Sequence, residues 1–292
     1  MNLGFIGFGE AAFELAFGLN EQGIKKIKAY DPLWNMTEYS DLIQDRAKAA
    51  NVTILESPEE IMRSSEAVIV AVPADKAYEV SRQLVSYVEG KCLYIDVSAA
   101  KPTIKKQIAA NVNSVGGEFV DAAMMGPLPV YKHRVPILAS GNGTDTFIEK
   151  MSIYEMNIEK VSELPGEATA AKLIRSIYMK GIVGLYIELL EAAQHYNVEN
   201  LVIDSLSETI NGKSFEETMN RLVTGTALHA NRRSIELGGT IDMLESAQID
   251  SSISKAAKAK IEKLALLNFK EKYQGQKPEH WKQVIEAFKV IT

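Results

Sequence analysis

Short hydrophobic runs alternate with amphipathic stretches over roughly the first 160 residues of the chain. Most of the runs are continuous rather than alternating, as is typical of parallel strands that are buried on both faces of a sheet. They cover residues 3–6, 27–30, 67–72, 93–97, 119–120 and 136–139. Helical spacing lies between them, at residues 11–21, 57–64, 74–88 and 103–110. This order predicts an α/β fold with a doubly wound parallel sheet and right-handed crossovers.

The strand pattern stops after Pro165-Gly166, and the rest of the chain shows helical spacing. Residues 167–197 contain no proline, which predicts a rod of about 30 residues and ~45 Å. Further helical patterns cover residues 201–210, 215–222, 227–236, 241–247, 252–269 and 280–288. We therefore expect a first domain at residues 1–163 and an all-α domain, entered by the long interdomain helix, at residues 164–292.

The long helix predicted at 167–197 is apolar around much of its circumference, so it needs packing partners on several sides. The second domain has only about 130 residues to supply them. We therefore expect a second copy of the chain to cover part of this helix, which would make the protein a homodimer.

Composition narrows the classes of function. The chain has 292 residues, of which 46% are hydrophobic. Its net charge of −6 argues against a protein that binds the negatively charged backbone of a nucleic acid. Cys92, the single cysteine, is expected to be a small buried hydrophobe, and the four histidines are too scattered for a metal motif. No run is apolar and long enough for a membrane helix, and the N-terminus lacks a basic leader. We therefore expect a soluble, cytoplasmic protein, most simply an enzyme.

A dinucleotide-binding fingerprint opens the chain. The first predicted strand leads into Gly7-Phe8-Gly9-Glu10-Ala11-Ala12, which is the G-x-G-x-x-A pattern, and then into a helix. Gly7 allows the tight turn, Gly9 lets the backbone approach a pyrophosphate, and Ala12 lets the helix and strand pack closely. The helix N-terminus, at Glu10 and Ala11, offers N–H groups to the phosphates. The pattern predicts a Rossmann-type domain that binds NAD or NADP.

Asp31 ends the next strand about 20 residues past the glycines, where an acid can bind both ribose hydroxyls and repel a 2′-phosphate. This favours NAD, although NADP is not excluded. The alternatives are a glycine turn followed by an aspartate that caps its own loop, or a methyltransferase nucleotide site, which the helical second half fits poorly. Val72 and Pro73, where the strand at 67–72 ends, either flank the cofactor or form an ordinary strand-to-helix turn.

Three later stretches complete a pattern of motifs. They are Asp96-Val97-Ser98-Ala99-Ala100-Lys101-Pro102, Asp121-Ala122-Ala123-Met124-Met125-Gly126-Pro127 and Gly166-Glu167-Ala168-Thr169-Ala170-Ala171-Lys172. In this order, and over essentially the whole chain, they resemble the β-hydroxyacid dehydrogenase superfamily, which includes 6-phosphogluconate and 3-hydroxyisobutyrate dehydrogenases. The corresponding family motifs are D-x-[ST]-x-x-x-P beside the nicotinamide, the substrate motif D-A-P-V-S-G-G, and G-x-G-x-x-x-K, which ends in the catalytic lysine.

The chain departs from the family pattern at four positions. Met125 replaces the substrate-binding serine, Pro127 the following glycine, Ala168 a motif glycine and Ser176 an asparagine. The sequence Met125-Gly126-Pro127 resembles the corresponding motif of one phosphogluconate-dehydrogenase-like branch of the family. Lys180-Gly181 and the basic stretch at 229–236 also resemble that branch. The identity of the substrate does not follow from this resemblance.

The resemblance implies that Lys172 is the general acid/base, a role open to a lysine whose pKa is brought down by burial and neighbours. Lys180, two turns further on, would lower the pKa of Lys172, bind a substrate carboxylate, or simply reach solvent. Ser176 would contact the substrate or the lysine, or bond its own backbone. Lys172, Ser176 and Lys180 form the predicted catalytic set.

The predicted substrate-binding residues are Ser98, Met124, Met125, Gly126, Arg232 and Arg233. Ser98, which would also lie beside the cofactor, either donates to a substrate carboxylate or holds its loop. The two methionines form apolar pocket walls or ordinary core. The two arginines recognise a carboxylate or pair with Glu236 at the surface. Residues 132–134 are expected to form a solvated loop.

These observations favour an NAD(P)-dependent oxidoreductase that transfers a hydride between the cofactor and the CH–OH group of a small β-hydroxy acid. Reduction of a C=N bond, as in imine reductases, is the first alternative. The second is a catalytically silent NAD-binding sensor or scaffold. Whether oxidation is coupled to decarboxylation, and which direction is physiological, is not decided by the sequence.

Overall fold

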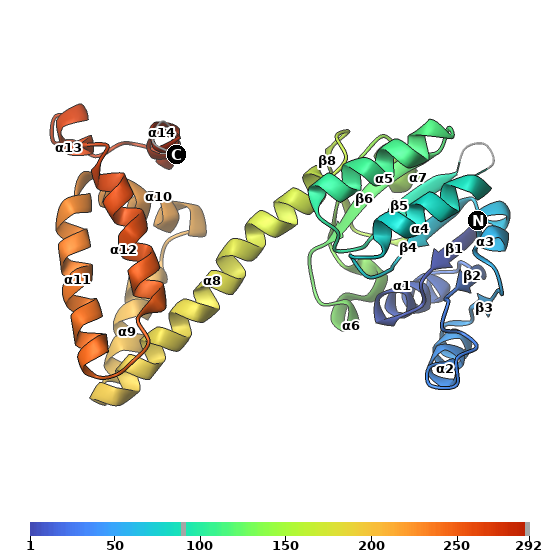
Figure 1. Cartoon of the computed structure of the whole chain (residues 1–292), viewed down its shortest axis with the longest axis horizontal. Coiled ribbons are helices and arrows are strands. Elements are labelled where there is room, and N and C mark those ends of the chain that lie inside the picture. The colour runs from blue at the N-terminus through green and yellow to red at the C-terminus, as the bar shows by residue number, and fades with distance from the viewer. Residues whose placement is uncertain (89–91, 290–292) are drawn as a thin grey trace. The chain divides into compact units, whose positions relative to one another are not determined.

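The computed structural model describes residues 1–88 and 92–289. These fall into two compact units, with the boundary between Ile177 and Tyr178 (Figure 1). Helix α8 (Glu167–Tyr196) begins in the first unit and ends in the second. The first unit is the expected Rossmann-type domain with a mostly parallel sheet. The second consists of helices throughout its described residues, so the predicted fold class is confirmed.

The first unit is built on one sheet of eight strands in the order β3-β2-β1-β4-β5-β6-β7-β8. The strands are β1 (Asn2–Ile6), β2 (Lys26–Tyr30), β3 (Thr53–Ile54), β4 (Ala67–Val70), β5 (Leu93–Asp96), β6 (Glu118–Met124), β7 (Ile137–Ser140) and β8 (Ile158–Ser162). The short β3 and the largely exposed β8 have no continuous apolar run, which is why the hydrophobic pattern does not predict them.

The expectation of a wholly parallel sheet is wrong at β7, which runs antiparallel to β6. A parallel return needs a long crossover, usually a helix that spans the face of the sheet. The connection between β6 and β7 offers only the one-turn helix α6 (Leu128–Tyr131) and a short 3₁₀ helix. The chain therefore turns back beside β6, and β8 then pairs parallel to β7.

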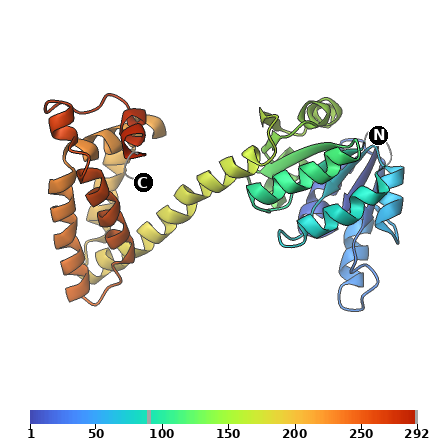
Figure 2. The same cartoon turned by 45° about the horizontal axis from the view of Figure 1, so that its top comes forward.

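Helices cover both faces of the sheet (Figure 2), and each face has its own hydrophobic core. One core includes residues of α1 (Glu10–Glu21), α2 (Ser40–Ala50) and α7 (Thr144–Met151). The other includes residues of α3 (Pro58–Ser64), α4 (Ala77–Leu84) and α5 (Pro102–Ser114). Side chains of a strand alternate between the faces, so both faces of a central strand are apolar and its sequence reads as a continuous run.

The second unit contains the end of α8 and the helices α9 to α14. These are α9 (Glu199–Ile210), α10 (Phe215–Leu228), α11 (Ala230–Ser246), α12 (Ser252–Ala265), α13 (Phe269–Lys272) and α14 (Trp281–Phe288). The stretches at 227–236 and 241–247 were expected as separate helices, but most of both belongs to α11. Gly238 and Gly239 lie inside α11 and do not break it; Gly238 lies close to Lys258 of α12, where the two helices pack together.

Candidate active site

The turn after β1 has the geometry of a dinucleotide-binding loop. Gly7 has a φ of +82°, and a Cβ at this position would lie 2.5 Å from the carbonyl oxygen of Ala71. Only glycine can therefore make this turn. A Cβ on Gly9 would meet no described atom within 4 Å, and no described side chain caps the first turn of α1. Open space and free N–H groups at a helix N-terminus suit the pyrophosphate of NAD(P).

Asp31 is nearly buried at the end of β2, and both of its carboxylate oxygens accept hydrogen bonds from the backbone. Phe8 N donates to one at 2.7 Å, and Leu33 N donates to the other at 2.9 Å. Asp31 does hold its own loop, as the alternative reading proposed, and it also joins the end of β2 to the glycine turn. Each oxygen keeps a lone pair that a ribose hydroxyl can use.

The other predicted cofactor-contacting residues lie at the start of α1 and in the loops after β4 and β5. Glu10 and Ala11 form the first turn of α1. β4 ends at Val70, so Val72 and Pro73 lie in the loop that follows it, and Val72 approaches Gly7. Ser98 is buried in the loop after β5, where its hydroxyl accepts from the N–H of Ala100 at 3.4 Å. The residues present therefore fit a bound dinucleotide at the carboxyl edge of the sheet.

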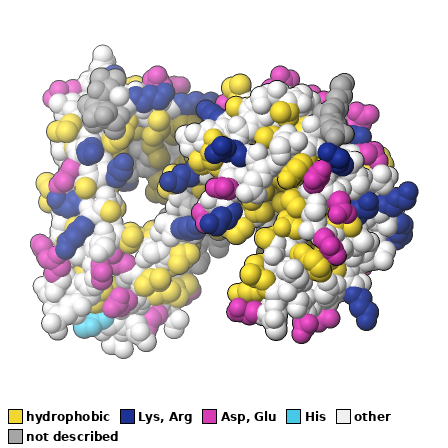
Figure 3. All heavy atoms as spheres, turned by 45° about the vertical axis from the view of Figure 1, so that its right-hand side comes forward, with side chains coloured by type: hydrophobic (Ala, Val, Ile, Leu, Met, Phe, Trp, Pro, Cys, Tyr) yellow, Lys and Arg dark blue, Asp and Glu magenta, His cyan; other side chains and the backbone are white. Residues whose placement is uncertain are grey.

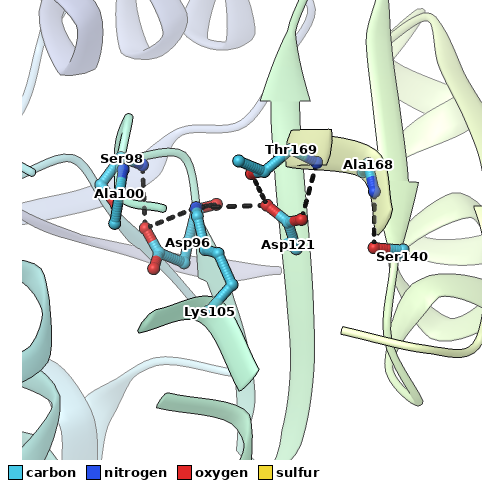
Figure 4. Close-up of polar contacts among 8 residues, drawn as sticks. All are labelled: Asp96, Ser98, Ala100, Lys105, Asp121, Ser140, Ala168 and Thr169. Atoms are coloured by element: carbon cyan, nitrogen blue, oxygen red, sulfur yellow. Dashed lines mark hydrogen bonds and ion pairs between the residues drawn. The ribbon is translucent and has the colours of Figure 1, made fainter. Parts of the chain in front are cut away.

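The first turn of α8 is fixed to the sheet by three side-chain contacts (Figure 4). Ala168 N donates to the hydroxyl of Ser140 on β7 at 3.0 Å. The carboxylate of Asp121 on β6 accepts from Thr169 N at 2.9 Å and from the Thr169 hydroxyl at 2.6 Å. Gly166, with φ +91°, turns the chain here, and a Cβ on it would lie 2.7 Å from the carbonyl oxygen of Pro102. A carboxylate at a helix N-terminus is electrostatically favourable.

A buried lysine that the sequence analysis missed lies beside this anchor. Lys105 of α5 is 0% exposed, and its ammonium group lies 3.2 Å from a carboxylate oxygen of Asp96 and 3.2 Å from one of Asp121 (Figure 4). The sequence did carry a signal: Lys105 shares a helix face with the buried residues Ile108 and Val112. A lysine on the apolar face of a helix needs a buried anionic partner.

Lys172 lies in the second turn of α8 and lines an open pocket of about 370 Å³ in the first unit. Its pKa is lowered, first by burial and then by the positive charge of Lys105, while Asp121 partly opposes the effect. The pocket is lined by Met124, Met125, Gly126, Pro127, Lys172, Arg175 and Ser176. The structure thus brings the substrate motif and the lysine motif together at one pocket.

The remaining predicted site residues lie in the second unit. Lys180 is exposed on α8, with no ion pair to any described residue. Arg232 and Glu236 of α11 form an exposed ion pair at 3.5 Å, and Arg233 donates to the hydroxyl of Thr226. The surface ion pair considered from the sequence is therefore present.

The expectation of a solvated loop at 132–134 is wrong for its middle residue. His133 is buried, with its ring against Gly18 of α1, and burial lowers its pKa. Gly18 has no side chain, so α1 leaves a space that the imidazole ring fills. Lys132 and Arg134 remain at the surface and pair with Glu21 and Glu155.

Comparison with known sequence families agrees with this geometry. Residues 2–148 match the NAD-binding domain of 6-phosphogluconate dehydrogenase, and residues 193–264 match a domain of unknown function, DUF1932. The chain therefore belongs to the family that carries the NAD-binding domain of 6-phosphogluconate dehydrogenase.

Three individual proteins illustrate the relationship. A conserved protein of unknown function, whose solved structure reveals similarity with 3-hydroxyacid dehydrogenases, is 30% identical over 94% of this chain and 100% of that one, with a TM-score of 0.63. An uncharacterized 28.5 kDa protein of Methanothermus fervidus is 27% identical over 81% of this chain and 88% of its own. An imine reductase variant from Myxococcus stipitatus in complex with NAD⁺ has a TM-score of 0.75, covering 98% of both chains, at 14% identity, which shows a shared fold.

The fold and these relatives define an NAD(P)-binding protein of the 3-hydroxyacid dehydrogenase-like superfamily. Across residues 1–88 and 92–289, no helix is both long and apolar enough to cross a bilayer. Within the same ranges, no group of three or more His, Cys, Asp or Glu side chains is arranged to hold a metal ion.

Proposed function

We propose that this protein is an NAD(P)-dependent oxidoreductase that acts on the CH–OH group of a small β-hydroxy acid, with Lys172 as general acid/base. The observation that carries the proposal is the lowered pKa of Lys172 in a pocket formed by two family motifs. β1, β4, β5 and β6 are mutually parallel, so the glycine turn and the end of β6 lie at the same edge of the sheet.

The chain's own groups supply proton transfer and orientation. When bound, the nicotinamide cofactor accepts or donates the hydride. In oxidation, the neutral amine of Lys172 takes the proton of the substrate hydroxyl. In reduction, the ammonium form returns it to the developing alkoxide. Burial favours the neutral form, so Lys172 can serve as a base at a lower pH than a solvated lysine could.

The pocket lining favours a small acid with an apolar part. Met124 and Met125 contribute apolar walls, while Arg175 contributes a guanidinium group that forms no ion pair within the described chain. An unpaired guanidinium beside the reacting centre suits a substrate carboxylate. Ser176 would then bind the hydroxyl group being oxidised. Arg232, Arg233 and Lys180 remain predicted contributors to the site.

The proposal is tested by following nicotinamide absorbance with NAD or NADP and a panel of β-hydroxy acids, for the wild type and Lys172→Met. We expect kcat to fall at least about 100-fold in the variant, because proton transfer would be lost. Cofactor affinity should stay unchanged, since Lys172 is not part of the glycine turn. Retention of more than about a tenth of wild-type kcat would exclude the assigned role.

The apolar pocket walls, together with the fold shared with imine reductases, favour reduction of a C=N bond as a second candidate. Cyclic imines with NADH or NADPH therefore belong in the same panel. Turnover of imines alone would replace the alcohol proposal. Cofactor binding without turnover of either class would favour a silent NAD-binding protein.

A further inference from the structure

The ammonium group of Lys105 is fully buried in the first unit, and each of its three N–H donors has an acceptor within reach. It donates to the carbonyl oxygen of Asp96 at 2.9 Å and pairs with the side chains of Asp96 and Asp121 at 3.2 Å each. All three side chains are 0% exposed. A buried cation in such a place is strongly disfavoured unless it balances negative charge, so this cluster is built around the charge of Lys105.

The cluster reaches Lys172 through one short path of contacts. Asp121 bonds Lys105 on one side and the backbone and hydroxyl of Thr169 on the other. Thr169 precedes Lys172 by three residues on α8, so the two lie on the same helix face. Any change in the charge or position of Asp121 therefore acts directly on the turn of α8 that carries Lys172.

We propose that Lys105 is a positioning residue for Lys172: its ammonium group holds the carboxylate of Asp121, which fixes the start of α8, and it places a second positive charge close to Lys172. This inference rests on the proposed acid/base role of Lys172. Without the cation, the charges of the two buried carboxylates would no longer be balanced, and the side chain of Asp121 would no longer be held in place. Asp121 would then bind the first turn of α8 less strongly.

The charged groups around Lys172 shift its pKa in opposite directions. Lys105 on α5 disfavours its ammonium form, and Asp121 on β6 favours it. Arg175, one turn further along α8, adds positive charge at the same pocket, and the other lining residues are uncharged. The pKa of Lys172 is lowered, so burial and Lys105 outweigh Asp121.

Two variants separate these charges. Lys105→Met/Asp96→Asn removes one positive and one negative charge, so the net charge of the cluster is kept while Asp121 loses its ion pair with Lys105. Asp121→Asn keeps Lys105 and removes the negative charge. Lys106→Met is the matched control, because Lys106 is the exposed neighbour of Lys105 on α5.

The measurement is the rate at which acetic anhydride acylates Lys172 in the full-length protein without added cofactor. It is followed by peptide mass spectrometry from about pH 6 to about pH 10, because the neutral amine is the reactive form. We expect the midpoint to rise by at least about half a pH unit in Lys105→Met/Asp96→Asn, which is about a threefold change in neutral amine. It should fall in Asp121→Asn and stay unchanged in Lys106→Met.

Midpoints that do not move, or that move in the same direction in both cluster variants, would show that Lys105 has a structural role only. If the double variant does not fold, an unchanged midpoint in Asp121→Asn is enough to overturn the inference. Acylation needs no turnover, so the result is independent of the proposed reaction. If Lys172→Met keeps the activity of the wild type, the proposed function is wrong, even if the acylation midpoints shift as expected.

Discussion

At the level of single residues, Lys172 sets the pH dependence expected of turnover. Alcohol oxidation needs the neutral amine, so kcat/KM for oxidation should rise with pH through the pKa of Lys172. Since burial and Lys105 lower this pKa, the midpoint should lie below that of a solvated lysine. Reduction needs the ammonium form, so kcat/KM for reduction should fall as the pH rises over the same range. Steady-state rates in both directions across pH test this, and a rise that persists in Lys172→Met would assign the titration to another group.

Asp31 is the residue expected to decide between NAD and NADP. Asp31→Asn keeps an acceptor for the N–H group of Phe8 but removes the charge that would repel a 2′-phosphate. We expect the ratio of NADPH to NADH affinity to rise about 10-fold or more, a change of about 1.4 kcal/mol. Fluorescence titration with each cofactor measures it. A wild-type protein that already prefers NADPH would contradict the assignment.

At the level of elements, the junction between the sheet and α8 depends on the bonds to Asp121. Thr169→Val removes the hydroxyl that donates to Asp121 at 2.6 Å but keeps the shape of the side chain and the backbone bond. Loss of a buried hydrogen bond to a charged acceptor should cost about 1.5–3 kcal/mol.

Chemical unfolding of the first unit, monitored alongside the control Thr169→Ser, measures this cost. The serine variant keeps a hydroxyl at the same place and should lose much less. Destabilisation of the serine variant with an unaffected valine variant would mean that the methyl group, rather than the hydrogen bond, stabilises the junction.

At the level of the whole molecule, we propose that two copies of the chain associate through the second unit. Large hydrophobic side chains are exposed along the end of α8 and along α9, among them Ile187 at 61% and Leu201 at 71%. Figure 3 shows hydrophobic side chains at the surface among charged ones. Extensive exposed apolar surface of this kind marks an interface, and a stable dimer needs about 1,600 Å² of buried surface.

Sedimentation of the wild type should therefore give a dimer, and Ile187→Asp or Leu201→Asp should shift it toward monomer. Ile153→Asp is a suitable control, because Ile153 is equally exposed at 74% but belongs to the first unit. A monomeric wild type, or an equal effect of all three substitutions, would contradict the proposed interface.

The sequence by itself determined the α/β fold, the dinucleotide turn and the long helix. These features follow from local rules: strands buried on both faces give continuous apolar runs, the turn at Gly7 admits only glycine, and proline-free helical spacing extends through α8. The structure differs from the sequence-based predictions where strand pairing or side-chain packing outweighs the local hydrophobic pattern. The strand at 137–140 reverses because its connection is too short for a crossover, and His133 is buried because Gly18 leaves a space for it.

Only the tertiary structure decided the electrostatics of the site. Lys105, Asp96, Asp121 and Thr169 come from four separate elements or loops of the sequence, and only sheet pairing and the packing of α5 and α8 bring them within hydrogen-bonding distance. The shift in the pKa of Lys172 depends on burial and on a charge 67 residues away in sequence. Sequence motifs identify a lysine as a candidate base, whereas distances and burial in the folded chain set its protonation.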